Sequence, residues 1–268
     1  MPSIKDLITE RKSVRTYDGT PLKDTHKKLL QERFSNSRNP FGIPVEFRFL
    51  DARENHLTSP VIIGTDLYFA AKVQRQPHFE LAYGYSFEDV CLYASSLGIG
   101  TVMLAGTLNR DAFEKAMEVQ KDEVMPCASP VGYPAAKKSL RETVMRRAIK
   151  ADERLPFGQL FFDGSFDRPL TEQAAGPFAD ALRMTRLSPS AANRQPVRAV
   201  LCGKCVHFYE ARSIKESPIC DIQLVDIGIA LCHFDLTAKE DGMDGHFVFG
   251  DPGISAPAET RYIVTYTL

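Results

Sequence analysis

Apolar residues follow helical spacing in some segments and strand alternation in others, and the same order of segments occurs twice. Ile4, Leu7 and Ile8 have the spacing of one helix face, whereas residues 45–50 alternate between apolar and polar side chains as a strand does. In the first half we expect helices at residues 4–11, 20–34, 86–97 and 110–117, and strands at 45–50, 101–104 and ending at 131–134. In the second half we expect a helix opening at 169–170, strands at 197–201 and 262–267, and a long apolar helix over 221–242.

Two pairs of matching residues indicate that the second series is a degenerate copy of the first. Pro169-Leu170 opens a helix as Pro21-Leu22 does, 148 positions later (169 − 21). Gly242 closes a helix as Gly98 does, 144 positions later (242 − 98). A near-constant offset favours an internal duplication, although helix–loop–strand units also resemble one another without any duplication.

The chain is long enough to hold two such halves. With 268 residues, 44% of them hydrophobic, it can bury a substantial core. We therefore expect an α+β fold of two pseudo-symmetric halves, residues 1–150 and 151–268, packed intimately as one functional unit. A charged stretch over residues 135–164 carries the chain from one half to the other.

Composition narrows the classes of function. A net charge of −1 gives no basic footprint for nucleic acid. Residues 1–12 are charged and amphipathic, unlike a secretory signal, and no apolar run approaches the roughly 20 residues of a membrane span. Six cysteines in a chain of this length do not make a disulfide scaffold. We expect a cytoplasmic protein with neither a nucleic-acid nor a membrane partner.

Two polar motifs stand near opposite ends of the chain. The first is Arg11-Lys12-Ser13-Val14-Arg15, at the end of the first helix, and the second is Ser188-Pro189-Ser190-Ala191-Ala192-Asn193-Arg194-Gln195-Pro196, between a helix and a strand. Arginine suits a phosphate because its planar fork donates two parallel, charge-assisted hydrogen bonds. Each motif has an ordinary alternative: a basic helix end favoured by the helix dipole, and a Ser/Pro/Asn turn.

Together the motifs resemble the two FMN-binding signatures of the nitroreductase family. In that family every subunit carries both signatures, and two subunits build each site. Here each signature occurs once in good form, so the resemblance implies a nitroreductase-like fused pseudo-dimer of mainly antiparallel sheets with helices. It further implies one site per polypeptide and a monomeric protein. The flavin contacts implied are Arg11, Lys12, Ser13, Arg15, Ser188, Pro189, Ser190, Asn193 and Gln195.

Two further segments resemble parts of the family site. Residues 97–106 resemble the segment whose backbone meets the flavin N5 edge, which implicates Met103, Leu104, Ala105 and Gly106. Lys137 or Lys138 resembles the family's second phosphate contact. One departure concerns Val197, which stands where the family commonly has an aromatic residue after Gln-Pro. This leaves the roles of Arg194 and Gln195 open.

The pseudo-symmetric second site has lost both signatures. Residues 36–44 stand where the second half has its Ser/Pro/Asn loop, and Arg146-Arg147-Ala148-Ile149-Lys150 is the only counterpart of the first motif, without a serine. We therefore expect substitution of Arg146 or Asn39 to leave flavin binding unchanged.

The function implied by the resemblance is an FMN-dependent oxidoreductase. It would pass electrons from NAD(P)H to a small nitroaromatic or quinone-like acceptor by a ping-pong mechanism, with no catalytic side chain, because hydride moves through flavin N5. A Rossmann fingerprint is not needed, since NAD(P)H stacks transiently on the flavin in this family. Two alternatives remain open: a non-catalytic flavin-binding or flavin-sensing protein, and a scaffold that has lost flavin.

Three other signals point to structure rather than chemistry. Cys202-Gly203-Lys204-Cys205 lies between two strand-like runs and favours a hairpin turn over a zinc site, so we expect no metal. Asp226 lies on the second long helix and has no assigned chemistry. His233, among apolar neighbours on the same helix, is typical of a packing residue.

Overall fold

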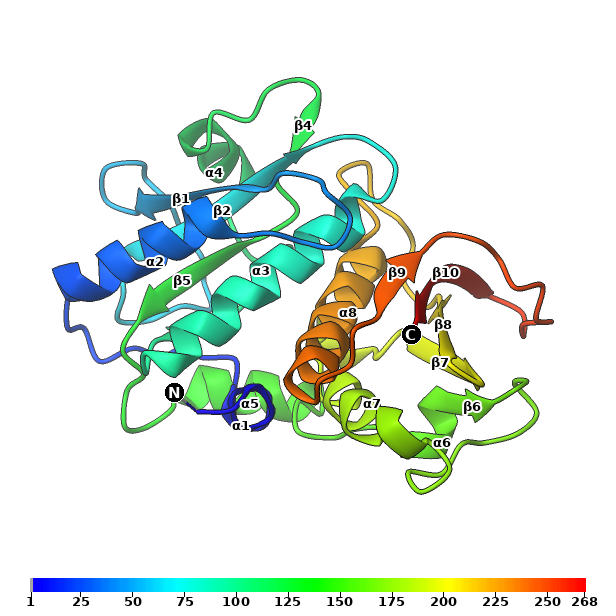
Figure 1. Ribbon diagram of the computed structural model, residues 1–268. Coiled ribbons are helices and arrows are strands. Elements are labelled where there is room, and N and C mark those ends of the chain that lie inside the picture. Colours follow the sequence, from blue (N-terminus) through cyan, green and yellow to red (C-terminus); the bar gives the residue numbers. More distant parts are fainter. Residues whose placement is uncertain (1) are drawn as a thin grey trace.

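Two long helices, α3 and α8, cross at the centre of the protein with one sheet on either side (Figure 1). The computed structural model describes residues 2–268. Its α-helices are α1 Ile4–Glu10, α2 Asp24–Asn36, α3 Phe79–Ser96, α4 Arg110–Ala116, α5 Leu140–Ala148, α6 Phe157–Leu160, α7 Ala179–Arg186 and α8 Ile222–Glu240. Its strands are β1 Glu46–Asp51, β2 Leu67–Gln74, β3 Gly100–Thr101, β4 Glu123–Val124, β5 Ala128–Gly132, β6 Phe161–Asp163, β7 Val197–Cys202, β8 Cys205–Ala211, β9 His246–Val248 and β10 Thr260–Thr267.

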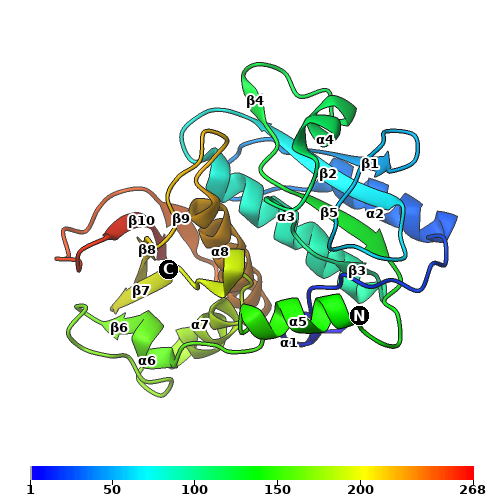
Figure 2. The same cartoon turned by 180° about the vertical axis from the view of Figure 1, so that it is seen from behind.

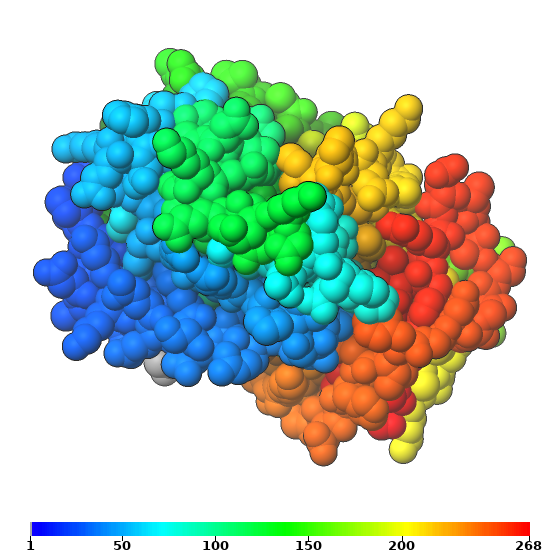
Figure 3. All heavy atoms as spheres, turned by 90° about the horizontal axis from the view of Figure 1, so that it is seen from above, coloured from blue at the N-terminus to red at the C-terminus, as the bar shows by residue number. Residues whose placement is uncertain are grey.

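The two sheets repeat one topology. The first runs β1-β2-β5-β3, with β4 paired to β2, and the second runs β7-β8-β10-β9, with β6 added beside β7. Every pairing is antiparallel except that of β6 with β7. In both halves the long helix stands at the same place in the chain. The helix α3 follows β2 and precedes β3, and α8 follows β8 and precedes β9. The halves are therefore pseudo-symmetric, as the sequence predicts. From above, they occupy opposite sides of the molecule, blue to green and orange to red (Figure 3).

The first sheet is covered on both faces. Side chains alternate along β2, so it contributes to the apolar cluster on each face. Phe69 and Ala71 pack toward α2 and α3, whereas Tyr68 and Ala70 face the cluster that includes α4. The ring of Tyr68 meets that of Phe113 edge-on, with centroids 5.2 Å apart.

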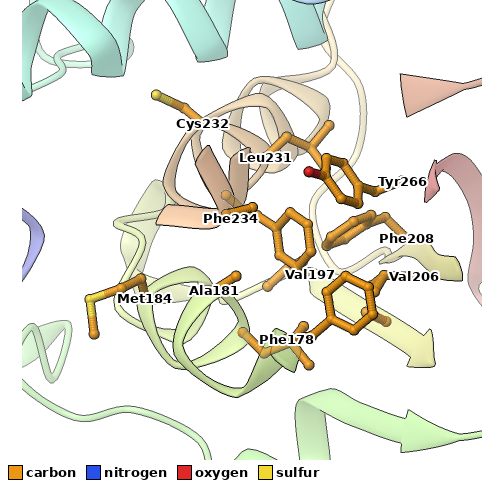
Figure 4. Packing of buried hydrophobic residues seen from close by; sticks show 14 of the residues in the cluster. Phe178, Ala181, Met184, Val197, Val206, Phe208, Leu231, Cys232, Phe234 and Tyr266 are labelled. Carbon is orange, nitrogen blue, oxygen red and sulfur yellow. The ribbon is translucent and has the colours of Figure 1, made fainter. Parts of the chain in front are cut away.

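Aromatic packing between α8 and the second sheet forms the other core (Figure 4). Phe234 of α8 meets Phe208 of β8 edge-on, with centroids 5.0 Å apart, and Tyr266 of β10 at 4.9 Å. Phe178, just before α7, stacks on Phe234 with ring centroids 6.2 Å apart. Fourteen of the nineteen residues of α8 are buried, as expected for a predominantly apolar helix in the interior.

The central helices approach so closely that only glycine fits at their crossing. A Cβ on Gly84 of α3 would lie 2.1 Å from the Val225 carbonyl oxygen, and a Cβ on Gly228 of α8 would lie 2.3 Å from the Leu81 carbonyl oxygen. Gly228 follows Gly84 by 144 positions (228 − 84), and Val225 follows Leu81 by the same number (225 − 81). The contact is therefore reciprocal, as in an interface with a two-fold axis.

The first helix packs on the opposite half of the molecule. Leu7 and Ile8 of α1 belong to the core that surrounds α7 and α8. Lys5 extends this docking through ion pairs to Asp180 at 3.1 Å and Asp241 at 2.6 Å. The chain then leaves α1 and returns to the first sheet, so the residues after α1 lie between the halves.

Several elements begin elsewhere than the sequence pattern predicts. The helices expected at Pro21-Leu22 and Pro169-Leu170 begin only at Asp24 and Ala179. Pro169 instead forms a β-bridge with Phe162, so one of the two anchors of the expected duplication is wrong, although the sheet topology is repeated. The helix expected from Ser86 begins at Phe79, and β2 falls in a stretch without an expected strand.

The expected hairpin at the cysteine pair is confirmed. Cys202 and Cys205 are opposite each other where β7 turns into β8, and both are free thiols. Within residues 2–268, no helix has the length and apolar character to cross a membrane.

Replacing a crossing glycine by alanine tests the close approach of the helices. Alanine favours a helix by about 1 kcal/mol, but overpacking against backbone costs more. We expect Gly84→Ala and Gly228→Ala each to lower the free energy of unfolding by about 2 kcal/mol or more, measured by urea denaturation.

Gly250→Ala is the control, because a Cβ there meets nothing within 4 Å and its φ is not positive. It should change stability by less than about 0.5 kcal/mol. A Gly84→Ala protein as stable as the control would contradict the described crossing.

Candidate functional site

A cavity of about 430 Å³ lies where the two halves meet, a size within the range of small-molecule sites. Five segments form its walls: the chain after α1, the chain after β3, α5, the loop before β7, and the facing turns of α3 and α8. Figure 2 shows α5 at the base of this junction, beside α1. The polar residues of the lining are Thr9, Arg11, Lys12, Ser13, Arg15, Glu88, Thr101, Thr107, Arg146, Asp152, Arg154, Ser190, Asn193 and Asp226.

The residues after α1 are held in an extended path along the cavity. The helix ends at Glu10, and Arg11 already has φ −57° and ψ 127°. Ser13 then forms a parallel β-bridge with Thr101, and the Val14 N–H donates to the Thr101 carbonyl at 2.9 Å. Extended backbone points alternate side chains to opposite faces, so Arg11, Ser13 and Arg15 share one face.

Three arginines of the cavity carry buried donor nitrogens without a protein hydrogen-bond partner. They are Nε of Arg11, Nε and Nη1 of Arg15 and Nε of Arg154, judged among residues 2–268. Burial lowers the pKa of Arg15, which nearby Arg146 also lowers and Glu142 raises. A buried N–H donor without a partner is costly, and an anionic or carbonyl-bearing ligand that accepts from it would remove that cost.

The other cations of the cavity differ in how far they are neutralised. Arg11 Nε lies 3.2 Å from Glu88 Oε1, and Arg146 forms an ion pair with Asp152. Lys12 has no ion pair among residues 2–268. The cavity therefore presents more positive than negative charge, as binding of an anion requires.

The loop before β7 has an unusual backbone. Ala192, Asn193 and Gln195 have φ values of 48°, 55° and 50°. Left-handed backbone is costly for residues other than glycine and persists only where the surroundings hold it. Here the Ala191 N–H donates to both carboxyl oxygens of Asp226 at 3.0 Å, and the Gln195 N–H donates to Ser190 Oγ at 2.8 Å.

The Asn193 side chain fastens this loop to the connecting segment. Its amide donates to the carbonyls of Lys150 at 2.7 Å and Glu153 at 3.1 Å, and its oxygen accepts from Arg154 at 3.2 Å. The amide of Asn193 is thus engaged by protein. The Ser190 hydroxyl accepts from a backbone N–H and still has its own hydrogen to donate to a ligand.

The chain after β3 is held from both sides. The N–H and carbonyl of Leu104 are both paired with Ala128, so this residue has no backbone donor left for a ligand. Arg110 donates to the carbonyls of Ala105 and Pro126, each at 3.1 Å. This leaves Met103, Ala105 and Gly106 as the residues whose N–H groups can approach a ligand, and Gly106 has open space around it.

The family model described as "Putative TM nitroreductase" matches residues 3–238. The chain belongs to the nitroreductase family. A crystal structure described as a "putative nitroreductase" from Thermotoga maritima shares this fold, with a TM-score of 0.61 at 20% identity over 99% of this chain and 92% of that chain.

Two shorter solved chains also match. One is described as a "Putative NADH dehydrogenase/NAD(P)H nitroreductase" from Bacteroides thetaiotaomicron (21% identity, TM-score 0.44, 51% of this chain and 89% of that chain). The other is an "FMN-dependent Nitroreductase" from Clostridium difficile (13% identity, TM-score 0.43, 50% of this chain and 88% of that chain). No curated protein matches the chain.

The structure brings most of the predicted nitroreductase site residues to one cavity. The predicted residues that line it are Arg11, Lys12, Ser13, Arg15, Met103, Leu104, Ala105, Gly106, Pro189, Ser190 and Asn193. Ser188 and Gln195 lie beside it and are buried, with the Gln195 amide bonded to Leu155 N and Asn193 O. Lys138 lines a separate, smaller cavity and Lys137 lines neither. Their contacts with flavin remain predictions.

One expectation about the lost site is wrong. Arg146 and Ile149 line the same cavity as Arg11, so they are not remnants of a second nitroreductase site. The helix α5 lies in the connection between the halves and closes over the retained site. A substitution of Arg146 would therefore change the lining of this cavity, contrary to the expectation that it leaves flavin binding unchanged.

Sequence reasoning assigned no role at the site to Glu88, Arg154 or Asp226, which line the cavity, or to Arg110, which supports the chain after β3. Glu88 and Asp226 are acidic residues on helices that are mostly apolar and buried. An acid in such a helix was the signal that could have indicated a functional site. Arg154 and Arg110 carried none, because contacts that form only in the folded chain, such as those with Asn193 and with the Pro126 carbonyl, hold them in place.

Aromatic side chains fill the position that pseudo-symmetry relates to the retained site. Phe41, in the counterpart of the signature loop, packs against Phe247 and Phe249 with ring centroids 5.9 and 6.0 Å away. Phe249 also stacks on His78 at 3.8 Å. Side chains thus occupy the space between this loop and β9. Within residues 2–268, no group of three or more His, Cys, Asp or Glu side chains is placed to hold a metal ion.

Asp226 is the most perturbed acid of the cavity wall. Burial raises its pKa well above the ordinary value, the Ala191 N–H opposes this, and the charges of Asp221 and Glu210 add to the rise. A raised pKa means that the folded protein holds this proton more tightly than the unfolded chain. Stability contributed by the neutral acid is therefore present at low pH and is lost as pH rises through the folded pKa.

Asp226→Asn removes this pH dependence while keeping an oxygen for the Ala191 N–H. We expect the free energy of unfolding of the variant, relative to wild type, to increase with pH by up to about 1.4 kcal/mol per pH unit above about pH 4 until the folded pKa is reached. Urea denaturation of both proteins across that range measures it. A difference that stays constant with pH would show that Asp226 is already ionised in the fold.

Proposed function

We propose that this protein is an FMN-dependent oxidoreductase that passes electrons from NAD(P)H to a small organic acceptor. The observation that carries the proposal is the cavity between the halves, where two motifs 178 positions apart (193 − 15) meet around unpartnered buried arginine donors. Membership of the nitroreductase family supports a flavin oxidoreductase. A protein that had lost its ligand would be under no constraint to keep such donors buried.

The residues present suit FMN. Arg11, Lys12 and Ser13 would hold the phosphate, which carries nearly two negative charges, by charge-assisted hydrogen bonds. Arg15 would face the polar edge of the ring, where its buried fork supplies the cation that an anionic reduced ring requires. Arg154, on the opposite wall, offers its free Nε.

When bound, FMN supplies hydride transfer at its ring N5. The chain's own contribution is to bind and orient. Ser190 offers a hydroxyl hydrogen, and the backbone of Met103, Ala105 and Gly106 can approach the ring edge closely because Ala105 and Gly106 are small. No side chain is assigned as acid or base for the hydride step.

One cavity serves both halves of the proposed reaction. NAD(P)H would bind, reduce the flavin and leave before the acceptor takes the same ring face, which is a ping-pong sequence. A nitroaromatic or quinone-like compound is the proposed acceptor, because both accept a hydride equivalent and are planar.

The first test is the visible spectrum of the purified protein, followed by quantification of flavin released on denaturation. We expect about one FMN per chain, since the pseudo-symmetric position is filled by Phe41, Phe247 and Phe249. Steady-state NAD(P)H oxidation with menadione then tests catalysis. Bound FMN without turnover would favour a flavin-sensing protein, and a colourless protein that takes up no FMN would overturn the proposal.

Arg15→Ala tests whether the unpartnered donors serve the flavin. Losing a charge-assisted contact should weaken FMN binding by on the order of tenfold to a hundredfold, measured by quenching of FMN fluorescence on titration with apoprotein. Arg53→Ala is the matched control, since that side chain is 82% exposed and forms a surface ion pair with Asp66. Equal affinity of the two variants would contradict the assignment of Arg15.

A further inference from the structure

A buried chain of polar contacts leads from the cavity into the junction of four helices. Arg11, just after α1, lies with Nε 3.2 Å from Oε1 of Glu88 on α3. The same oxygen is 2.9 Å from Nε2 of His233 on α8, whose Nδ1 is 3.1 Å from the Met184 carbonyl of α7. The exposed fractions of the Arg11, Glu88 and His233 side chains are 8%, 1% and 0%. Arg11 and Glu88 line the cavity, whereas His233 does not.

The partners of His233 determine its protons. A main-chain carbonyl can only accept, so Nδ1 must carry a hydrogen. Nε2 faces Oε1 of Glu88, an oxygen that also lies 3.2 Å from the Arg11 guanidinium, which is the arrangement of a carboxylate between two cations. An ionised carboxylate also only accepts, so Nε2 must carry a hydrogen too. With both nitrogens donating, the ring is an imidazolium.

This protonation decides the charge that the cavity presents. An ionised Glu88 on the cavity wall would by itself cancel the charge of Arg11 and repel a bound phosphate. His233, positively charged and wholly buried behind Glu88, neutralises the carboxylate from the side away from the ligand. Arg11, Glu88 and His233 together keep one net positive charge.

We propose that His233 is a positioning residue that remains an imidazolium, orients Glu88 and leaves the charge of Arg11 available to an anion in the cavity. The proposal rests on the proposed function in taking that anion to be the phosphate of FMN. The packing role expected of His233 from its apolar neighbours is thus incomplete, because both of its ring nitrogens are engaged by polar groups.

Nitrogen NMR of the flavin-free protein, labelled with ¹⁵N-histidine, shows directly which ring nitrogens of His233 carry a hydrogen. We expect the His233 signals, assigned by their loss in His233→Gln, to show hydrogens on both nitrogens at neutral pH. His207 is an internal reference: burial lowers its pKa, and its Nδ1 pairs with the Thr265 hydroxyl at 2.7 Å. A single protonated nitrogen on His233 would overturn the proposal, whether or not the protein binds flavin.

The affinities of wild type and His233→Gln for FMN and for riboflavin then distinguish an electrostatic role of His233 from a packing role. His233→Gln leaves Glu88 ionised without its partner, so FMN should bind on the order of tenfold more weakly, whereas riboflavin, which has no phosphate, should be much less affected. Equal losses for both ligands would mean a structural role only, and would overturn the proposal.

The double variant Glu88→Gln/His233→Gln provides the rescue. It removes one negative and one positive charge, restoring the net charge of wild type, and should recover most of the FMN affinity lost in His233→Gln. Failure to recover, in a variant with the wild-type circular dichroism spectrum, would count against the charge argument. If wild type itself bound no FMN, the proposed function would fail, while the NMR result would still decide the state of His233.

Discussion

The close crossing of α3 and α8 is the constraint on which the rest of the structure depends. Gly84 and Gly228 allow each helix to touch the backbone of the other, which fixes the separation of the two halves. Each of the two helices also places one residue of the cavity wall close to this contact. Glu88 is one turn beyond Gly84, and Asp226 is on the turn that contains Gly228. A change in the helix separation would therefore move the two acids that these helices place in the cavity wall, together with the loop that Asp226 holds.

Joining two similar halves in one chain has allowed them to diverge. In a symmetric dimer every substitution appears twice, so a side chain that blocks one site blocks both. Here the position related to the retained cavity holds Phe41, Phe247 and Phe249, while the retained cavity keeps cations and small residues. The connection between the halves has also taken a role: α5 and Arg154 close over the cavity, in a segment for which a two-chain enzyme would have no direct equivalent.

The sequence was most informative where a local pattern and the tertiary environment agree. The apolar run of α8, the turn between Cys202 and Cys205 and the two polar motifs all appear as expected. Proline at 21 and 169 was misleading, because the following helices begin only at Asp24 and Ala179 and Pro169 forms a β-bridge with Phe162. Arg154, Arg110 and the His233 contacts were beyond sequence reasoning. Arg154 meets the Asn193 side chain, Arg110 meets the Pro126 carbonyl and His233 meets Glu88, and only the folded chain brings these groups together.

The docking of α1 on the opposite half has a consequence for biosynthesis. This helix is made long before its ion-pair partners Asp180 and Asp241 and its apolar partners on α7 and α8. Until they emerge from the ribosome, Leu7 and Ile8 have nowhere to pack and Arg11 has no fixed place. Contacts of such long sequence separation are slow to close and leave apolar surface exposed meanwhile. The nascent first half thus lacks a completed cavity, which can form only after α8 has been made.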